Sequence, residues 1–181
     1  QHDRTLRQDV RDAGQERLAS ATEVVDAQMA SLKDNVESVA AQISSGDLDR
    51  ASLQASLEDR LSGNSGFWSI GVAYDFWQTG IEYDFSGANA LASNTTPYLA
   101  RPGGQVTFTP FPYNYFDRTE GTSDYERGWW FRDGLEMGGH WTGAYFGNTS
   151  RRMIAEYVAP FSHPDPASSD LPAPEGVALG G

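Results

Sequence analysis

The residues best suited to binding chemistry lie together between positions 124 and 161. An arginine and three tryptophans occur there within a short stretch: Arg127, Trp129, Trp130 and Trp141. A guanidinium group is a planar fork of donors that matches a carboxylate, and indole rings supply flat apolar walls. This combination favours a pocket for a small anionic or zwitterionic molecule.

The elements that must position these residues follow from the local pattern. Tyr125–Leu135 is typical of a short helix or turn. His140–Phe146 and Arg152–Phe161 are rich in aromatic and β-branched residues and predict two antiparallel strands. Between them Gly147-Asn148 can adopt positive φ angles and close the turn.

Four short motifs then occur in a definite order: Pro97-Tyr98-x-x-Arg101-x-Gly103-Gly104, Arg127-Gly-Trp129-Trp130, Trp141-x-x-Ala144-Tyr145 and Ile154-x-x-Tyr157-x-x-Pro160-Phe161. Their order and spacing resemble those of the extracytoplasmic Cache sensor domains of bacterial receptors. The resemblance covers about residues 15–161. It implies a PAS-like antiparallel sheet behind a long N-terminal helix, and a ligand-binding function.

The resemblance also implies which residues contact a ligand. In Cache domains that bind amino acids, the matching Arg and Trp contact the ligand carboxylate, which implicates Arg127 and Trp129, with Trp130 where the family usually has Tyr. The further candidate contacts are Tyr125, Tyr98, Arg101 and Tyr145. Two positions depart from the amino-acid pattern: Thr122 stands where a Tyr is usual, and the amine-binding Asp is absent. The expected ligand is a carboxylate, an amino acid or another small polar metabolite. From composition alone, a helix that lines the core with one surface Arg is the alternative.

Composition limits the other classes of function. The net charge of −12 argues against nucleic acid and anionic membrane surfaces as partners. Without cysteine the chain has no disulfide and no thiolate chemistry. His2, His140 and His163 are far apart in sequence, so no metal site is predicted, and no cofactor motif occurs. The acidic residues near Arg127 are interpreted as a solvated face, and no nucleophile–base pair is readable. We therefore expect no enzymatic activity in these residues.

A long helix is predicted over Arg4–Ile43, which has no proline and one glycine. Its apolar residues form one seam: Leu18, Val25, Leu32 and Val39, with Thr22, Met29, Val36 and Ile43 four positions beyond each. Gly46 is expected to end this helix, and Asp47 or Asp49 to cap the next. Leu53, Leu57 and Leu61 mark that second, short helix.

The strands follow the helices, which predicts an α+β fold: the long helix packed on a PAS-like antiparallel sheet of five to six strands. Phe67–Phe76 is the best strand candidate, Ile81–Phe85 another, and Pro97–Pro110 a hairpin turning at Pro102-Gly103-Gly104. Three parts are predicted: residues 1–46 as a signalling or stalk helix, 47–161 as the sensor domain, and 162–181 as a Pro/Ser-rich linker with the start of a further strand.

The sequence thus predicts the ligand-sensing part of a bacterial signal-transduction receptor, on the periplasmic face of the inner membrane. Its expected partners are a small-molecule ligand and a second copy paired through the N-terminal helix, with the membrane reached only through an anchor outside these residues. One alternative is a carbohydrate-binding module with Trp68, Trp77 and Trp141 stacking on sugars. Another is a ligand-free dimerisation domain whose pocket is filled by Trp130 and Phe131.

Overall fold

The computed structural model describes residues 2–75, 97–109, 111, 115, 117–147, 149–162 and 176–181. It divides into two compact units, Gln1–Ser31 and Leu32–Gly181. The predicted strand at Ile81–Phe85, the residue Trp77 and most of the linker after Ser162 lie outside the described residues. None of the described helices has an apolar stretch long enough to span a bilayer.

The first helix, α1, runs from His2 to Ser45, as the sequence predicts. In the second unit the predicted seam is buried, with Leu32, Val36, Val39 and Ile43 in the core. In the first unit the same seam is exposed: Leu18 is 69% and Val25 52% accessible. Gly46, with φ of 80°, ends the helix because a left-handed residue cannot continue it.

A short helix, α2, follows from Arg50 to Gly63. The side chain of Asp49 caps it by accepting a hydrogen bond of 2.9 Å from the backbone N–H of Ser52. Leu53, Leu57 and Leu61 are all buried, as their spacing predicts. Each contributes about 1.5–3 kcal/mol by leaving water, so α2 is held mainly by its apolar face.

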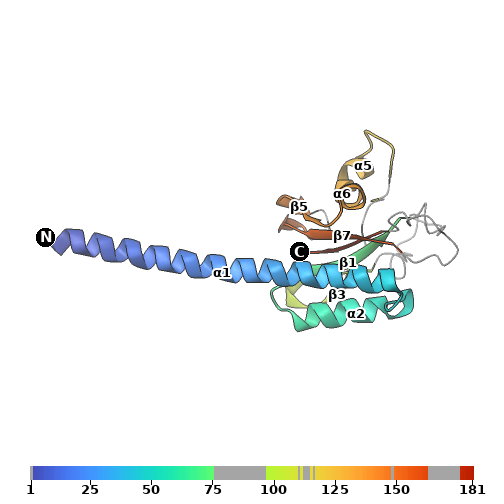
Figure 1. Ribbon diagram of the computed structural model, residues 1–181. Helices are drawn as coiled ribbons and strands as arrows, with labels where there is room; N and C mark the ends of the chain where they lie inside the picture. The colour runs from blue at the N-terminus through green and yellow to red at the C-terminus, as the bar shows by residue number, and fades with distance from the viewer. Residues whose placement is uncertain are drawn as a thin grey trace. The chain divides into compact units, whose positions relative to one another are not determined.

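The sheet has six strands in the order β3-β2-β1-β8-β7-β4, and every recorded pair is antiparallel (Figure 1). Its strands are β1 (Ser69–Tyr74), β2 (Tyr98–Ala100), β3 (Thr107–Phe108), β4 (His140–Trp141), β7 (Tyr157–Phe161) and β8 (Gly176–Gly180). The short 3₁₀ helix η1 (Pro102–Gly104) turns the predicted hairpin between β2 and β3. The α+β class and the six-stranded antiparallel sheet are thereby confirmed.

Strand β8 lies in the middle of the sheet, between β1 and β7. It pairs along its whole length with both neighbours, from Gly176 to Gly180. The sequence predicts only the start of a strand here, beyond a linker. The structure makes this segment a central part of the core, while the predicted division at residues 46 and 161 stays a prediction.

The two long strands predicted at 140–146 and 152–161 are each interrupted. β4 pairs with β7, whereas β5 (Tyr145–Gly147) and β6 (Arg152–Ile154) form a separate two-stranded sheet. Between the two ladders residues 142–144 lie opposite residues 155–156, so one side has an extra residue and the ladder bulges. The predicted turn also differs: Gly147 belongs to β5, Asn148 is outside the described residues, and Arg151 has a positive φ of 52°.

Successive residues of the sheet face two separate hydrophobic cores. Tyr157 and Ala159 face the core formed with α1 and α2, and Val158 between them faces the other core. That second core contains Trp130 and Phe131 from helix α6 (Trp129–Met137). Figure 1 shows α2 and α6 on opposite sides of the sheet. We call the surface under α6 the site face.

Helix α6 follows the short helix α5 (Ser123–Arg127), which confirms the helical prediction for Tyr125–Leu135. Thr122 caps α5, accepting a 3.1 Å hydrogen bond from the N–H of Tyr125. The two helices meet at Gly128, whose Cα lies against the carbonyl of Tyr115: a Cβ there would be 2.1 Å from that oxygen.

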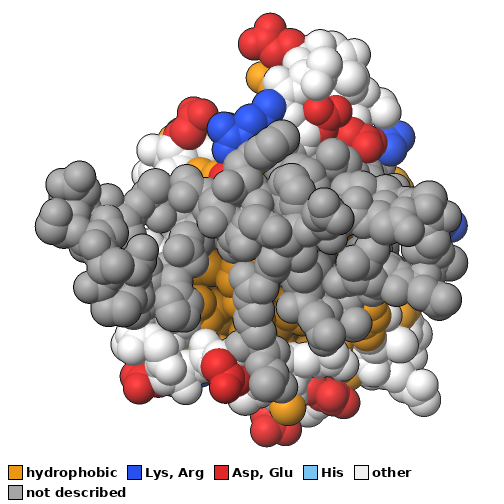
Figure 2. Space-filling model, turned by 90° about the vertical axis from the view of Figure 1, so that its right-hand side faces the viewer, with side chains coloured by type: hydrophobic (Ala, Val, Ile, Leu, Met, Phe, Trp, Pro, Cys, Tyr) orange, Lys and Arg blue, Asp and Glu red, His pale blue; other side chains and the backbone are white. Residues whose placement is uncertain are grey.

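Figure 2 shows one face of the protein. Acidic side chains lie towards the rim of this face, and hydrophobic side chains are visible near its middle.

Candidate functional site

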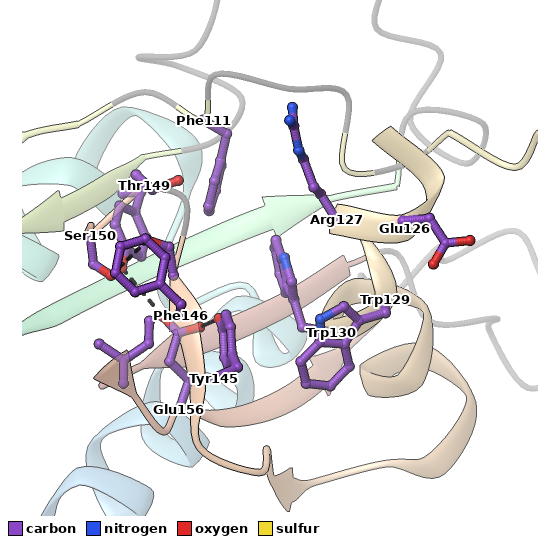
Figure 3. A pocket seen from close by; sticks show the side chains of 13 residues that line it. Phe111, Glu126, Arg127, Trp129, Trp130, Tyr145, Phe146, Thr149, Ser150 and Glu156 are labelled. Carbon is purple, nitrogen blue, oxygen red and sulfur yellow. Dashed lines mark hydrogen bonds between the residues drawn. The ribbon is translucent and has the colours of Figure 1, made fainter. Parts of the chain in front are cut away.

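A cavity of about 260 Å³ lies on the site face, between the α5–α6 pair and the β5–β6 hairpin (Figure 3). Five of the residues predicted as ligand contacts line it: Tyr98, Arg127, Trp129, Trp130 and Tyr145. They come from β2, α5, α6 and β5. The volume is just below the range of about 300–1,000 Å³ for drug-sized ligands, so a metabolite-sized molecule fits it.

The apolar walls of the cavity are aromatic rings that support one another. Trp130 stacks on Phe111, with ring centroids 5.4 Å apart and an angle of 28° between planes. Trp129 meets Tyr145 edge-on across the gap between α6 and β5, at 5.3 Å and 77°. Trp130 itself is buried, yet the cavity remains open beside it. The condition stated for a ligand-free domain, a pocket filled by Trp130 and Phe131, is therefore not met.

Tyr98 reaches the cavity because β1 has a glycine opposite it. A Cβ on Gly71 would lie 2.7 Å from Cδ2 of the Tyr98 ring, so only glycine lets this ring lie flat across the strand. The Tyr98 ring then packs on Phe111 at 4.9 Å between centroids.

Arg127 stands at the rim of the cavity. Its side chain is 44% exposed, and Nη1 lies 3.8 Å from Oδ1 of Asp124, a weak ion pair at this exposure. In Figure 3 its guanidinium points away from Glu156. A hollow does lie beneath this residue, and its donors are available to an acidic group that enters from outside.

The inner end of the cavity holds a carboxyl group that the sequence analysis missed. Glu156 is 2% exposed. The hydroxyl of Tyr98 donates to its Oε1 over 3.3 Å, and the hydroxyl of Tyr145 donates to its Oε2. Burial raises the pKa of this carboxyl above its ordinary value of 4.5, while the two tyrosine hydrogen bonds act in the opposite direction.

Thr142 fixes Glu156 at the bulge between β6 and β7. The N–H of Glu156 donates to Oγ1 of Thr142 over 2.8 Å, and the N–H of Thr142 donates to the carbonyl of Glu156 over 2.8 Å. At the bulge the N–H of Glu156 therefore donates to the Thr142 hydroxyl instead of to a backbone carbonyl of the neighbouring strand. One signal in the sequence was available: Glu156 is a lone charge within the apolar run Met153–Phe161, two residues before the inward-facing Val158.

The turn between β5 and β6 adds hydroxyl groups to the wall. Thr149 lines the cavity, and its buried Oγ1 has no hydrogen-bond partner among the described residues. Oγ of Ser150 donates to the carbonyl of Gly147 over 3.3 Å. A buried hydroxyl without a partner costs free energy unless water or a ligand satisfies it.

Two predicted contacts are not brought to this cavity. Arg101 points to the other end of its strand, where Nε donates to the carbonyl of Phe67 over 3.1 Å and Nη2 to those of Asn64 (3.3 Å) and Leu61. Its hydrogen bonds thus hold the end of α2 and the segment that leads into β1. The Tyr125 ring lies under the guanidinium of Arg132, 3.7 Å from its centre. Neither residue lines the cavity.

Two tryptophans of the carbohydrate alternative, Trp68 and Trp141, contact other side chains of the protein. The ring of Trp68 is covered by the guanidinium of Arg152, 3.3 Å from its centre. Trp141 packs edge-on against Tyr157, with 5.3 Å between centroids. Trp77 lies outside the described part of the chain. Two of the three rings are therefore engaged within the protein.

No family model matches this chain, and neither does any curated protein. Solved structures do resemble it. Methyl-accepting chemotaxis protein X superposes with a TM-score of 0.62 and 12% identity, over 93% of this chain and 60% of its own. The extracellular domain of the histidine kinase mmHK1S-Z3 gives 0.59 and 20%, over 86% and 53%. The ligand-binding domain of Mlp24, solved with asparagine, gives 0.51 and 17%, over 94% and 55%.

The chain shares its fold with these structures, as the resemblance to Cache domains predicts. It spans between 53% and 60% of the length of each of them, so the fold is shared over that part alone. At these identities the likeness establishes the fold, and the ligand must be argued from the cavity itself.

Proposed function

We propose that this chain is the extracytoplasmic ligand-sensing domain of a bacterial signal-transduction receptor and binds a small polar metabolite. The observation that carries the proposal is the aromatic cavity, which has Arg127 at its rim and a buried carboxyl at its inner end. The structures with a similar fold, sensor domains of histidine kinases and chemoreceptors, support the same class of function. We place the chain, like them, outside the cytoplasm.

Arg127 is the residue that selects an acidic group in this proposal. It is the cavity's charged donor among the described lining residues, and a half-exposed guanidinium gives up little hydration when it pairs with a carboxylate. A carboxylate or an amino acid fits both this donor and the small volume. The Mlp24 domain solved with asparagine supports an amino acid as one candidate.

Strand β7 is the proposed route from the cavity to α1. Glu156, directly before this strand, faces the cavity, whereas Tyr157 faces the opposite side of the sheet. There the Tyr157 hydroxyl donates to Oε1 of Glu37 in α1 over 2.6 Å. Burial and the neighbouring Glu37 raise the pKa of Tyr157 to about 12, so this hydroxyl keeps its proton at physiological pH. A ligand that shifts β7 changes a direct bond to α1, which relays the signal as a population shift.

The test is a thermal-shift screen of amino acids and organic acids against the wild-type chain and Arg127→Ala. A ligand at a hundred times its dissociation constant stabilises the domain by about 2.7 kcal/mol, which for this size is roughly 5–10 °C. We expect Arg127→Ala to lose the shift given by carboxylates.

The matched control is Arg17→Ala, because Arg17 lies exposed on α1 and outside the cavity. It should keep the full shift. If Arg127→Ala responds like this control, Arg127 is not part of the binding site.

A further inference from the structure

Within the described part of the chain, the carboxyl of Glu156 has hydrogen-bond donors but no cation beside it. Its recorded partners are the hydroxyls of Tyr98 and Tyr145, and among the described residues no Lys, Arg or His forms an ion pair with it. Two phenolic donors do not neutralise an ionised carboxylate, and such a charge in a buried site is costly without a partner. Each oxygen still has a lone pair for a further donor.

The position of this carboxyl is fixed before any ligand arrives. Thr142 holds its backbone through two hydrogen bonds of 2.8 Å, and the tyrosines hold its two oxygens from different strands, β2 and β5. The indole of Trp130 lines the same cavity, and an aromatic face attracts a cation. The inner end of the cavity is thus a rigid acceptor site with an apolar wall.

We propose that Glu156 binds a cationic nitrogen of the ligand, so that the ligand is an amine or a zwitterion and not a simple carboxylate. This inference rests on the sensing function proposed above and names the chemical class of its ligand. Glu156 and Arg127 lie at the inner end and the rim of one cavity and have opposite charges. A zwitterion entering with its ammonium group first places that group at Glu156 and its acidic group toward Arg127.

Binding of a cation at Glu156 is coupled to the protonation equilibrium of this carboxyl group. Burial raises the pKa of this carboxyl, whereas a cation bound beside it would lower that pKa. The other titratable groups that line the cavity are Tyr98 from β2, Tyr145 from β5, and Arg127 and Glu126 from α5. In Figure 3 the Glu126 carboxylate points away from the cavity, so it does not compete for the cation. Ligand affinity should therefore weaken as the pH falls through the pKa of Glu156.

The experiment uses matched pairs of compounds, each an amino acid and the acid that lacks its ammonium group, together with simple amines. Thermal shifts and titration calorimetry are measured on the wild-type chain and on Glu156→Gln, a neutral variant of the same shape. We expect wild type to bind the ammonium-bearing member of a pair, and Glu156→Gln to bind it on the order of tenfold or more weakly.

A second measurement needs no variant. For the wild-type chain, the affinity for the ammonium-bearing compound should fall by up to about tenfold per pH unit below the pKa of Glu156, as one displaced proton requires. This pH-dependent measurement tests the proposal even if Glu156→Gln folds poorly.

Each remaining outcome overturns one of the two ideas. If acids without an ammonium group bind wild type as well as their partners do, and binding does not depend on Glu156 or on pH, the sensing function stands and the cation site is wrong. If no compound of the panel binds wild type, the proposed small-metabolite sensor is itself wrong.

Discussion

At the scale of single residues, the role of a carboxyl group depends on its surroundings and not on how many acidic residues the chain contains. Most acidic side chains of this protein are exposed and contribute to its net charge of −12. Glu156 is buried because Thr142 draws its backbone into the bulge and two tyrosines cover its oxygens. One acidic residue among many thereby becomes a candidate recognition group.

This burial predicts a pH-dependent stability difference between the ligand-free wild type and Glu156→Gln. Because burial raises the pKa of folded Glu156 above 4.5, its stabilising contribution is complete below pH 4.5 and is lost as the pH rises through the raised pKa. Wild type should therefore lose stability relative to Glu156→Gln over that interval. Thermal melts of both chains across a pH series measure the difference. Parallel curves at every pH would mean that Glu156 titrates as an ordinary exposed carboxyl.

At the scale of elements, the α5–α6 junction decides where Arg127 and Trp129 lie. Gly128 separates the two helices, and its backbone touches the carbonyl of Tyr115. Tyr115 is in turn anchored to β1, since its hydroxyl donates to the carbonyl of Tyr74 over 2.9 Å. The glycine between Arg127 and Trp129 is thus the point at which the binding motif is attached to the sheet.

Replacing Gly128 with alanine should disturb this attachment. The added Cβ would lie 2.1 Å from a backbone oxygen, which cannot move aside as a flexible side chain would. We expect a loss of about 1–3 kcal/mol in the free energy of unfolding, measured by denaturant titration. The control is Gly63→Ala at the end of α2, where a Cβ has open space. Equal stability of the two variants would mean that the Tyr115 segment repacks at no cost.

At the scale of the whole molecule, the seam of α1 has two different environments. From Leu32 onward it is buried in the domain core, whereas Leu18 and Val25 in the unit Gln1–Ser31 are exposed. Apolar residues repeated every seven positions on an exposed helix favour pairing with a second helix of the same kind. We therefore expect the exposed half of the seam to form a homodimer.

Charges on the seam should break that dimer. The double variant Leu18→Asp/Val25→Asp is compared with Ala13→Asp/Ala27→Asp, which adds the same charge at exposed positions off the seam. Sedimentation equilibrium should give a dissociation constant at least about tenfold higher for the seam variant than for the control, because two apolar contacts per chain are lost. Identical values for both variants would exclude this seam as the interface.

Much of the architecture could be predicted from local sequence. The helix α1 follows from a long stretch without proline, α2 from leucines four residues apart, and the β2–β3 hairpin from Pro102-Gly103-Gly104. Arg127, Trp129 and Trp130 were predicted as ligand contacts from the chemistry of their side chains and from the resemblance to Cache domains, and all three line the cavity.

The sequence by itself therefore determined α1, α2 and the β2–β3 hairpin, because periodicity, capping and turn chemistry depend on neighbours a few residues away. Only the tertiary structure decided three further points: Glu156 lies at the inner end of the cavity, Arg101 binds the end of α2, and β8 occupies the middle of the sheet. Each depends on partners far along the chain, since Glu156 is held by Tyr98 from another strand and β8 pairs with β1. Burial and strand order are set by such long-range contacts, which no local pattern encodes.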